Sequence, residues 1–172
     1  MKINNKIIDS VIAEVAGEDV ISLVRYLKDK KNISEFKIAD AINKEINETR
    51  NMLYRLFNVN LVSFIRKKDK KKGWYIYYWT FNLKRVKDLF WELKKKKSIA
   101  LKERLKRELS TDFFACDKKC IRLSFEQATD FEYKCPECGK LMHQEENKQI
   151  IEDIKKQIEE LEKELADKKA IP

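Results

Sequence analysis

The chain has 172 residues and a formal charge of +9, with 38 lysines and arginines against 29 aspartates and glutamates. This excess of cations favours a polyanionic partner such as nucleic acid, because contact with phosphates releases condensed counterions. No apolar run approaches the roughly 18 residues of a membrane span, and the first residues lack the apolar stretch of a signal peptide. We therefore expect a soluble intracellular protein with no membrane partner.

The first two predicted elements are amphipathic helices. Ile7–Ala16 places apolar residues at helical spacing, and Gly17 follows where a left-handed cap ends a helix. A second apolar face runs from Val20 to Leu27 before a polar stretch. Both segments are predicted to bury one face.

Two further helices are predicted in close succession. Ser34 is a favourable N-cap for a short helix that carries Phe36 to Ile42. Asn47 is expected to cap the next helix, Glu48–Phe57, after only a short turn. This succession is typical of a helix-turn-helix.

The periodicity changes after Asn58. Val59–Ile65 and Trp74–Phe81 are β-branched and aromatic runs typical of strands, and a basic turn, residues 66–73, separates them. Helices followed by a strand, a basic turn and a second strand predict a winged helix over residues 1–93, with the turn as its wing.

The wing is a candidate surface for contact with nucleic acid or protein. Flat rings beside a cationic tip suit unstacked bases or a protein groove. The alternatives are that the charges only keep a hairpin tip solvated, and that individual rings pack in the core. The candidate contact residues are Lys67, Lys68, Lys70, Lys71, Lys72, Trp74, Tyr75, Tyr77, Tyr78 and Trp79.

The helix that would read bases in a sequence-specific winged helix carries little positive charge. Its charged residues are only Glu48, Arg50 and Arg55. Positive charge is concentrated instead in the wing and in a long helix that begins after Asn82. This distribution favours docking on a protein, or contact with the DNA backbone, over operator recognition. Within the long helix we expect a linker around Lys94–Ser98 and assign residues 94–110 as a linker helix.

Four cysteines form the strongest chemical motif. Cys116 and Cys120 make one pair, and Cys135 and Cys138 make a second pair after 14 intervening residues, close to the spacing of a zinc ribbon. We predict one structural Zn²⁺ in a ribbon over residues 111–146, with Gly139 in a tight turn. The strands of this ribbon are expected at Ile121–Phe125 and Phe131–Lys134.

Other cysteine chemistry is less well supported. Disulfides need an oxidising compartment, and a redox dithiol would be expected within a βαβ unit that this sequence lacks. Four thiolates leave no open position for a catalytic water. His143, the only histidine, is expected to be a bystander. We find no catalytic residues and predict that the chain is not an enzyme.

The C-terminal segment, residues 147–172, is predicted to be an amphipathic helix. Five apolar residues follow the alternating three and four residue spacing of a short coiled-coil seam: Ile151, Ile154, Ile158, Leu161 and Leu165. About two heptads are marginal for an independent dimer, so the seam packs either on this chain or on a partner. The fold class is α+β.

The order of these parts resembles archaeal transcription factor E, the counterpart of the alpha subunit of eukaryotic general transcription factor IIE. The most specific matches are the aromatic strand Gly73–Trp79 and the ribbon blocks Phe113–Cys116 and Tyr133–Gly139. In one departure, three residues rather than two separate Cys116 and Cys120, and Ile121 follows where the family has glycine.

This resemblance implies a non-enzymatic initiation factor. Members join the preinitiation complex on RNA polymerase, contact its clamp and stalk, and assist promoter melting alongside TATA-binding protein and transcription factor B. We expect the wing to contact the non-template strand of the bubble or the polymerase, in a cytoplasmic, nucleoid-associated setting, and a second subunit is left open as a partner. The alternatives are a sequence-specific winged-helix repressor and a scaffold that joins proteins through its C-terminal helix.

Overall fold

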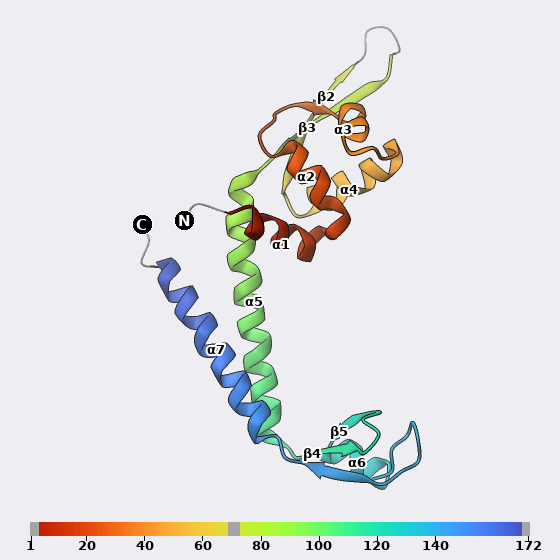
Figure 1. The fold of residues 1–172 in the computed structure, drawn as a ribbon, viewed down its shortest axis with the longest axis vertical. Coiled ribbons are helices and arrows are strands. Elements are labelled where there is room, and N and C mark those ends of the chain that lie inside the picture. The colour runs from red at the N-terminus through yellow and green to blue at the C-terminus, as the bar shows by residue number, and fades with distance from the viewer. Residues whose placement is uncertain (1–3, 69–72, 170–172) are drawn as a thin grey trace. The chain divides into compact units, whose positions relative to one another are not determined.

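The computed structural model of the chain describes residues 4–68 and 73–169 (Figure 1). It divides into two compact units, Met1–Glu92 and Leu93–Pro172. Each unit combines helices with a small antiparallel sheet, which confirms the predicted α+β class. None of the helices in the described ranges has the length and apolar character that a bilayer crossing requires.

The first unit packs helices against a three-stranded sheet with the order β1-β3-β2. Its elements are α1 (Asn5–Ala16), the 3-10 helix η1 (Glu18–Val20), α2 (Ile21–Leu27), β1 (Ile33–Ser34), α3 (Glu35–Ile42), α4 (Ile46–Asn58), β2 (Val62–Lys68), β3 (Tyr75–Phe81) and the start of α5 (Leu83–Ser110). This is the order predicted for a winged helix, with η1 and β1 as additions.

The helix ends show which local signals are effective. Gly17 ends α1 with a φ of 103°, and its N–H donates to the carbonyls of Ile12 and Ala13. Ser34 caps α3 by accepting a 3.4 Å bond from the N–H of Lys37. Both predictions are confirmed. The predicted cap at Asn47 is wrong, because α4 already begins at Ile46.

The core of the first unit lies between the helices and one face of the sheet. Each aliphatic side chain buried there stabilises the fold by roughly 1.5–3 kcal/mol. The largest fully buried side chains are Trp79, Ile12, Leu23, Leu27, Ile38, Met52, Leu53, Leu56, Leu61, Val11, Val20 and Val24.

Strands β2 and β3 form a hairpin whose register runs from Val62 opposite Phe81 to Lys68 opposite Tyr75. Strand β2 begins later than predicted, because α4 extends to Asn58 and Asn60 then turns the chain with a φ of 59°. Lys70, Lys71 and Lys72 of the predicted wing lie outside the described residues.

Helix α5 is continuous from Leu83 to Ser110, so the expected linker at Lys94–Ser98 is helical. Residues 93–110 of this helix belong to the second unit, where α7 (Lys148–Lys169) runs antiparallel beside them (Figure 1). Ion pairs join Lys94 to Glu164 and Lys102 to Glu162.

The amphipathic seam of α7 is occupied within the chain. Ile154 and Ile158 are buried, and so is Ser98 on α5. Burial of these residues together with the ion pairs between the two helices identifies α5 as the surface on which the seam packs.

The second unit also contains the ribbon. Its elements are β4 (Phe113–Cys116), β5 (Arg122–Ser124), α6 (Phe125–Asp130) and β6 (Met142–Glu145), and the sheet order is β5-β4-β6. The strand predicted at Phe131–Lys134 is wrong, because Glu132 and Tyr133 take left-handed φ values of 50° and 57° and form a turn. Only Lys134 makes an isolated bridge, to Leu141.

Candidate metal centre and wing surface

The four cysteines converge at one end of the ribbon. Their sulfur atoms all lie within 4.8 Å of one another, although the two pairs are far apart in sequence. Cys116 Sγ is 3.4 Å from Cys138 Sγ and 4.0 Å from Cys120 Sγ. These distances exceed the roughly 2.05 Å of a disulfide, and all four residues are free thiols.

Two tight turns present the thiols. In the first, the N–H of Lys119 donates to the carbonyl of Cys116 at 2.7 Å, and Lys119 takes a left-handed φ of 54°. In the second, the N–H of Gly139 donates to the carbonyl of Cys135 at 2.7 Å, and Gly139 takes a φ of 71°. Left-handed Lys119 thus accommodates the extra residue between Cys116 and Cys120.

Electrostatics within the cluster favour a cation. The pKa of the Cys116 thiol is lowered to about 7, mainly because the backbone N–H of Lys118 donates to the sulfur. The pKa of the Cys120 thiol is raised to about 12 by desolvation and by the neighbouring sulfur atoms, although its side chain reaches the surface. Because four thiolates cannot gather without compensation, the arrangement calls for a metal ion.

The donor set fits a tetrahedral ion. With metal–sulfur bonds of roughly 2.3 Å, a tetrahedral Zn²⁺ places its sulfur ligands about 3.8 Å apart, between the two separations observed here. His143 lies outside the cluster, where its Nε2 is 3.7 Å from a carboxylate oxygen of Asp117. The cluster can therefore hold one metal ion through sulfur alone.

The ribbon has little else to stabilise it. Its buried core consists of Cys116, Leu123, Ala128, Cys135 and Met142, so two of the four thiols are themselves core residues. Half-buried Phe114 and Tyr133 pack against this core with ring centroids 4.9 Å apart. Such a small core makes the metal part of the folding free energy.

The hairpin carries a ladder of rings that becomes more exposed toward its tip. Phe64 lies 5.0 Å from both Trp79 and Tyr77 between ring centroids, and the Arg66 guanidinium lies 5.0 Å from the ring of Tyr75. Trp79 is 1% exposed, whereas Tyr75 is 52% exposed. The cations and rings therefore interleave on the outer half of the hairpin.

We define the wing surface as Lys67, Lys68, Trp74 and Tyr75, all of which are exposed. Tyr77 and Tyr78 are half-buried beside it, and Lys67 Nζ lies 5.6 Å from the ring centroid of Tyr78. Trp79 does not belong to this surface, because Tyr54, Phe57 and Phe64 cover its ring. We therefore withdraw Trp79 as a contact residue.

Both arginines of α4 are engaged within the chain. Arg50 donates to buried Glu35 at 2.6 Å. Arg55 donates to the carbonyl of Ala16 at 2.7 Å and also pairs with Asp19. Neither guanidinium can reach a base edge without breaking its internal contacts.

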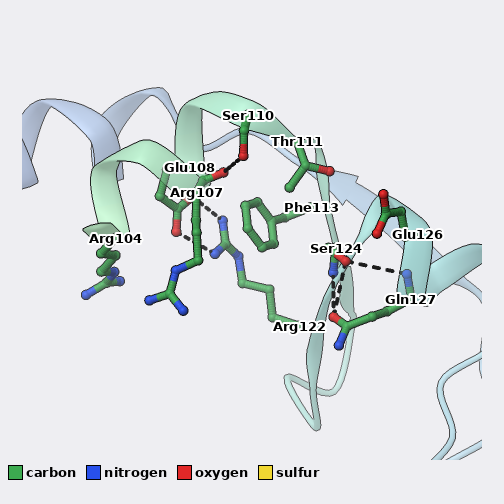
Figure 2. A pocket seen from close by; sticks show the side chains of 10 residues that line it. All are labelled: Arg104, Arg107, Glu108, Ser110, Thr111, Phe113, Arg122, Ser124, Glu126 and Gln127. Carbon is green, nitrogen blue, oxygen red and sulfur yellow. Dashed lines mark hydrogen bonds and ion pairs between the residues drawn. The ribbon is translucent and has the colours of Figure 1, made fainter. Parts of the chain in front are cut away.

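The ribbon is joined to α5 by charged residues that the sequence analysis did not single out. Arg122 on β5 donates to both carboxylate oxygens of buried Glu108 on α5, at 2.8 and 2.9 Å (Figure 2). This bidentate pair lowers the pKa of Glu108 below its usual value, chiefly through the bonds from Arg122. No sequence motif marks the pair, because its members are 14 residues apart and each is common on surfaces.

Comparison with known proteins agrees with this arrangement. The family model of the TFIIE alpha subunit matches residues 6–112. The chain is 35% identical to transcription factor E of Thermococcus kodakarensis, over 98% of this chain and 91% of that protein. It is 32% identical to transcription factor E of Metallosphaera sedula, over 94% of this chain and 93% of that protein.

A solved structure is similar in fold alone. A possible transcriptional regulator from Methanosarcina mazei superimposes with a TM-score of 0.51 at 10% identity, over 59% of this chain and 88% of that one. The relatives, in contrast, match along nearly the whole chain at more than 30% identity. The chain therefore belongs to the TFIIE alpha family, with the transcription factor E proteins, which are general transcription initiation factors.

Proposed function

We propose that this factor joins the preinitiation complex on RNA polymerase and assists promoter opening through its wing surface. The observation that carries the proposal is the exposure of Trp74 and Tyr75, each 52% exposed, beside Lys67 and Lys68 on a hairpin tip. Large exposed rings are unfavourable in water and gain free energy when a partner covers them. The partners are the polymerase clamp and stalk, with promoter DNA close by.

The proposed mechanism is preferential binding to the open complex. A factor shifts an equilibrium only if it binds one state better than the other. Unstacked bases of the non-template strand exist only when the duplex is melted, and stacking on an aromatic ring is worth roughly 1–3 kcal/mol per base. Trp74 and Tyr75 supply such rings, and the neighbouring lysines supply attraction to phosphate. TATA-binding protein and transcription factor B would act at the same promoter, and a second subunit is left open as a further partner.

The state of α4 supports this mechanism over operator recognition. A sequence-specific winged helix places arginine, lysine, asparagine or glutamine at base edges. Here Arg50 and Arg55 are held by Glu35 and Asp19. The factor is therefore expected to bind free duplex DNA weakly, without sequence preference and with strong dependence on salt.

We assign Zn²⁺ as the resident metal and a structural role to it. Cys116, Cys120, Cys135 and Cys138 would hold the ion and leave no open position for water, so it would supply no catalysis. Its contribution would be to fold the ribbon and thereby to fix β4 and β5 against the end of α5. The factor would then act by binding and not as an enzyme.

Promoter opening in a reconstituted system tests the wing. Permanganate reactivity of melted thymines would be measured with the wild-type factor and with Trp74→Ala/Tyr75→Ala. We expect the double variant to reduce the stimulation of opening several-fold, because it removes both exposed rings. The variant should keep one zinc per chain and an unchanged circular dichroism spectrum.

Phe36→Ala is a matched control, since Phe36 is an exposed ring on α3 in the same unit. It should leave opening unchanged. Crosslinking would separate the two contacts: Trp74 replaced by a photoreactive residue should label the clamp or the non-template strand. Normal stimulation by the double variant would overturn the proposal, and so would an equal loss with Phe36→Ala.

A further inference from the structure

A cavity of about 520 Å³ opens between the last turns of α5 and the β5–α6 edge of the ribbon. Figure 2 shows Arg104 and Arg107 on the α5 side, Glu126 and Gln127 on the α6 side, and Phe113 with Arg122 between them. All these residues belong to the second unit. The cavity is separate from both the thiol cluster and the wing surface.

The wall formed by Arg122 is already neutralised. Arg122 pairs with Glu108 and with Glu145, and its guanidinium lies 3.8 Å from the centroid of the Phe113 ring. Asn147 also donates to a carboxylate oxygen of Glu108, at 3.1 Å. These contacts hold the wall in one conformation, so it offers a fixed frame and no spare charge.

The two arginines of α5 differ from Arg122. Both are exposed, and among the described residues no carboxylate forms an ion pair with Arg104 or Arg107. They lie three positions apart, so they project from neighbouring places on the helix toward the cavity. With Glu108 neutralised by Arg122, the open charges of the lining are these two cations and Glu126, which leaves an excess of one positive charge.

The lining selects among anions. Guanidinium groups bind carboxylates through paired hydrogen bonds, and the hydroxyls of Thr111 and Ser124 add polar partners. A nucleic-acid strand would have to run past Glu126 on the opposite wall, where its phosphates would be repelled. A compact cavity with cations on one side and an anion on the other fits one or two carboxylates on a short peptide.

We infer that this cavity is a docking site for an acidic segment of a partner protein, with Arg104 and Arg107 as the residues that bind its carboxylates. The site does not depend on the wing or on contact with the polymerase. It would give the second unit a specific attachment of its own, distinct from the exposed rings of the first unit.

Fluorescence anisotropy with the full-length zinc-loaded factor tests the site. The probe is a short labelled peptide of alternating glutamate and serine, titrated at low salt. We expect Arg104→Ala/Arg107→Ala to weaken binding about tenfold, because two charge-assisted contacts are lost. Glu126→Gln should tighten binding, since it removes the repulsive charge from the opposite wall.

Lys95→Ala/Lys96→Ala is the matched control, because it removes the same charge from exposed positions of the same helix outside the cavity. This variant should stay within about twofold of the wild type. The inference is overturned if wild type does not bind the peptide, or if both double variants lose affinity equally. Tighter binding of labelled oligothymidine, with the same dependence on Arg104 and Arg107, would overturn it in favour of nucleic acid.

Discussion

Arg50 donates a 2.6 Å bond to Glu35, and this links the middle of α4 to the first residue of α3. Glu35 is only 2% exposed, so its carboxylate depends on this partner. The pair converts a position that reads DNA in other winged helices into an internal support.

Replacing Arg50 by alanine should therefore affect stability and leave DNA binding unchanged. The variant leaves the buried Glu35 carboxylate unpaired, which should lower the free energy of unfolding by about 2 kcal/mol, less than for a fully buried pair because Arg50 is partly exposed. Urea unfolding followed by tryptophan fluorescence measures the loss. Arg50→Met combined with Glu35→Gln should recover most of it, and a large drop in duplex DNA affinity for either variant would contradict the assignment.

Acid should weaken the attachment of the ribbon to α5 through Glu108. The bonds from Arg122 hold the folded-state pKa of Glu108 below its unfolded value. The stabilisation is therefore complete above the unfolded pKa and disappears as the pH falls through the folded pKa. Hydrogen exchange of the β4 and β5 amides, corrected for intrinsic rates, should show this loss of protection below about pH 4.5.

Glu108→Gln provides the comparison for that experiment. Acid also releases metal from thiolates, but that effect is common to both proteins, so their difference isolates the carboxylate. The variant should be less protected at neutral pH, and the gap should close in acid. A constant gap across the pH range would show that Glu108 does not act through its charge.

Removal of zinc should unfold the ribbon and spare the first unit. The buried core of the ribbon is small, and structural zinc contributes on the order of 10–16 kcal/mol to comparable sites. All three tryptophans, Trp74, Trp79 and Trp91, lie in the first unit, so their fluorescence should hardly change on chelation. Amide exchange across β4–β6 should become fast, and Cys135→Ser should have the same effect. Retained protection of these strands after complete chelation would refute a structural role for the metal.

Glycine at position 119 should improve the first cysteine turn. Lys119 has a φ of 54°, a conformation that costs a non-glycine residue roughly 1–2 kcal/mol. The entropy of glycine in the unfolded chain offsets part of this gain, so Lys119→Gly should stabilise the zinc-bound ribbon by up to about 1 kcal/mol. Competition with a chelator of known affinity measures the change. Lys119→Ala keeps the strain, so an equal gain with alanine would point to the lysine charge instead.

The elements with strong local signals could be predicted from the sequence. Ser34, Gly17 and the start of α5 after Asn82 all lie where capping and periodicity place them. The pairing of cysteines into one cluster also followed from spacing. These features depend on neighbours within a few residues, which a sequence pattern contains.

The interior of the ribbon could not be predicted as well. Helix α6 has a capping box in which Ser124 and Gln127 bond reciprocally, and the Ser-x-x-Gln motif could have revealed it. The turn at Glu132 and Tyr133 has no such signal, because neither residue is one that favours positive φ. The burial of Trp79 also depends on distant contacts, since Tyr54 and Phe57 come from α4.

The ribbon is an excursion from a helical pair. Asn147, just before α7, donates a 2.8 Å bond to the backbone carbonyl of Glu108, near the end of α5, so the chain departs and returns at almost the same point. Because its two ends are tied together there, the metal-bearing module can be exchanged, shortened or lost without altering the register of α5 against α7. The two helices thus form a stem on which different heads can be mounted, and this separates the evolution of the metal module from that of the stem.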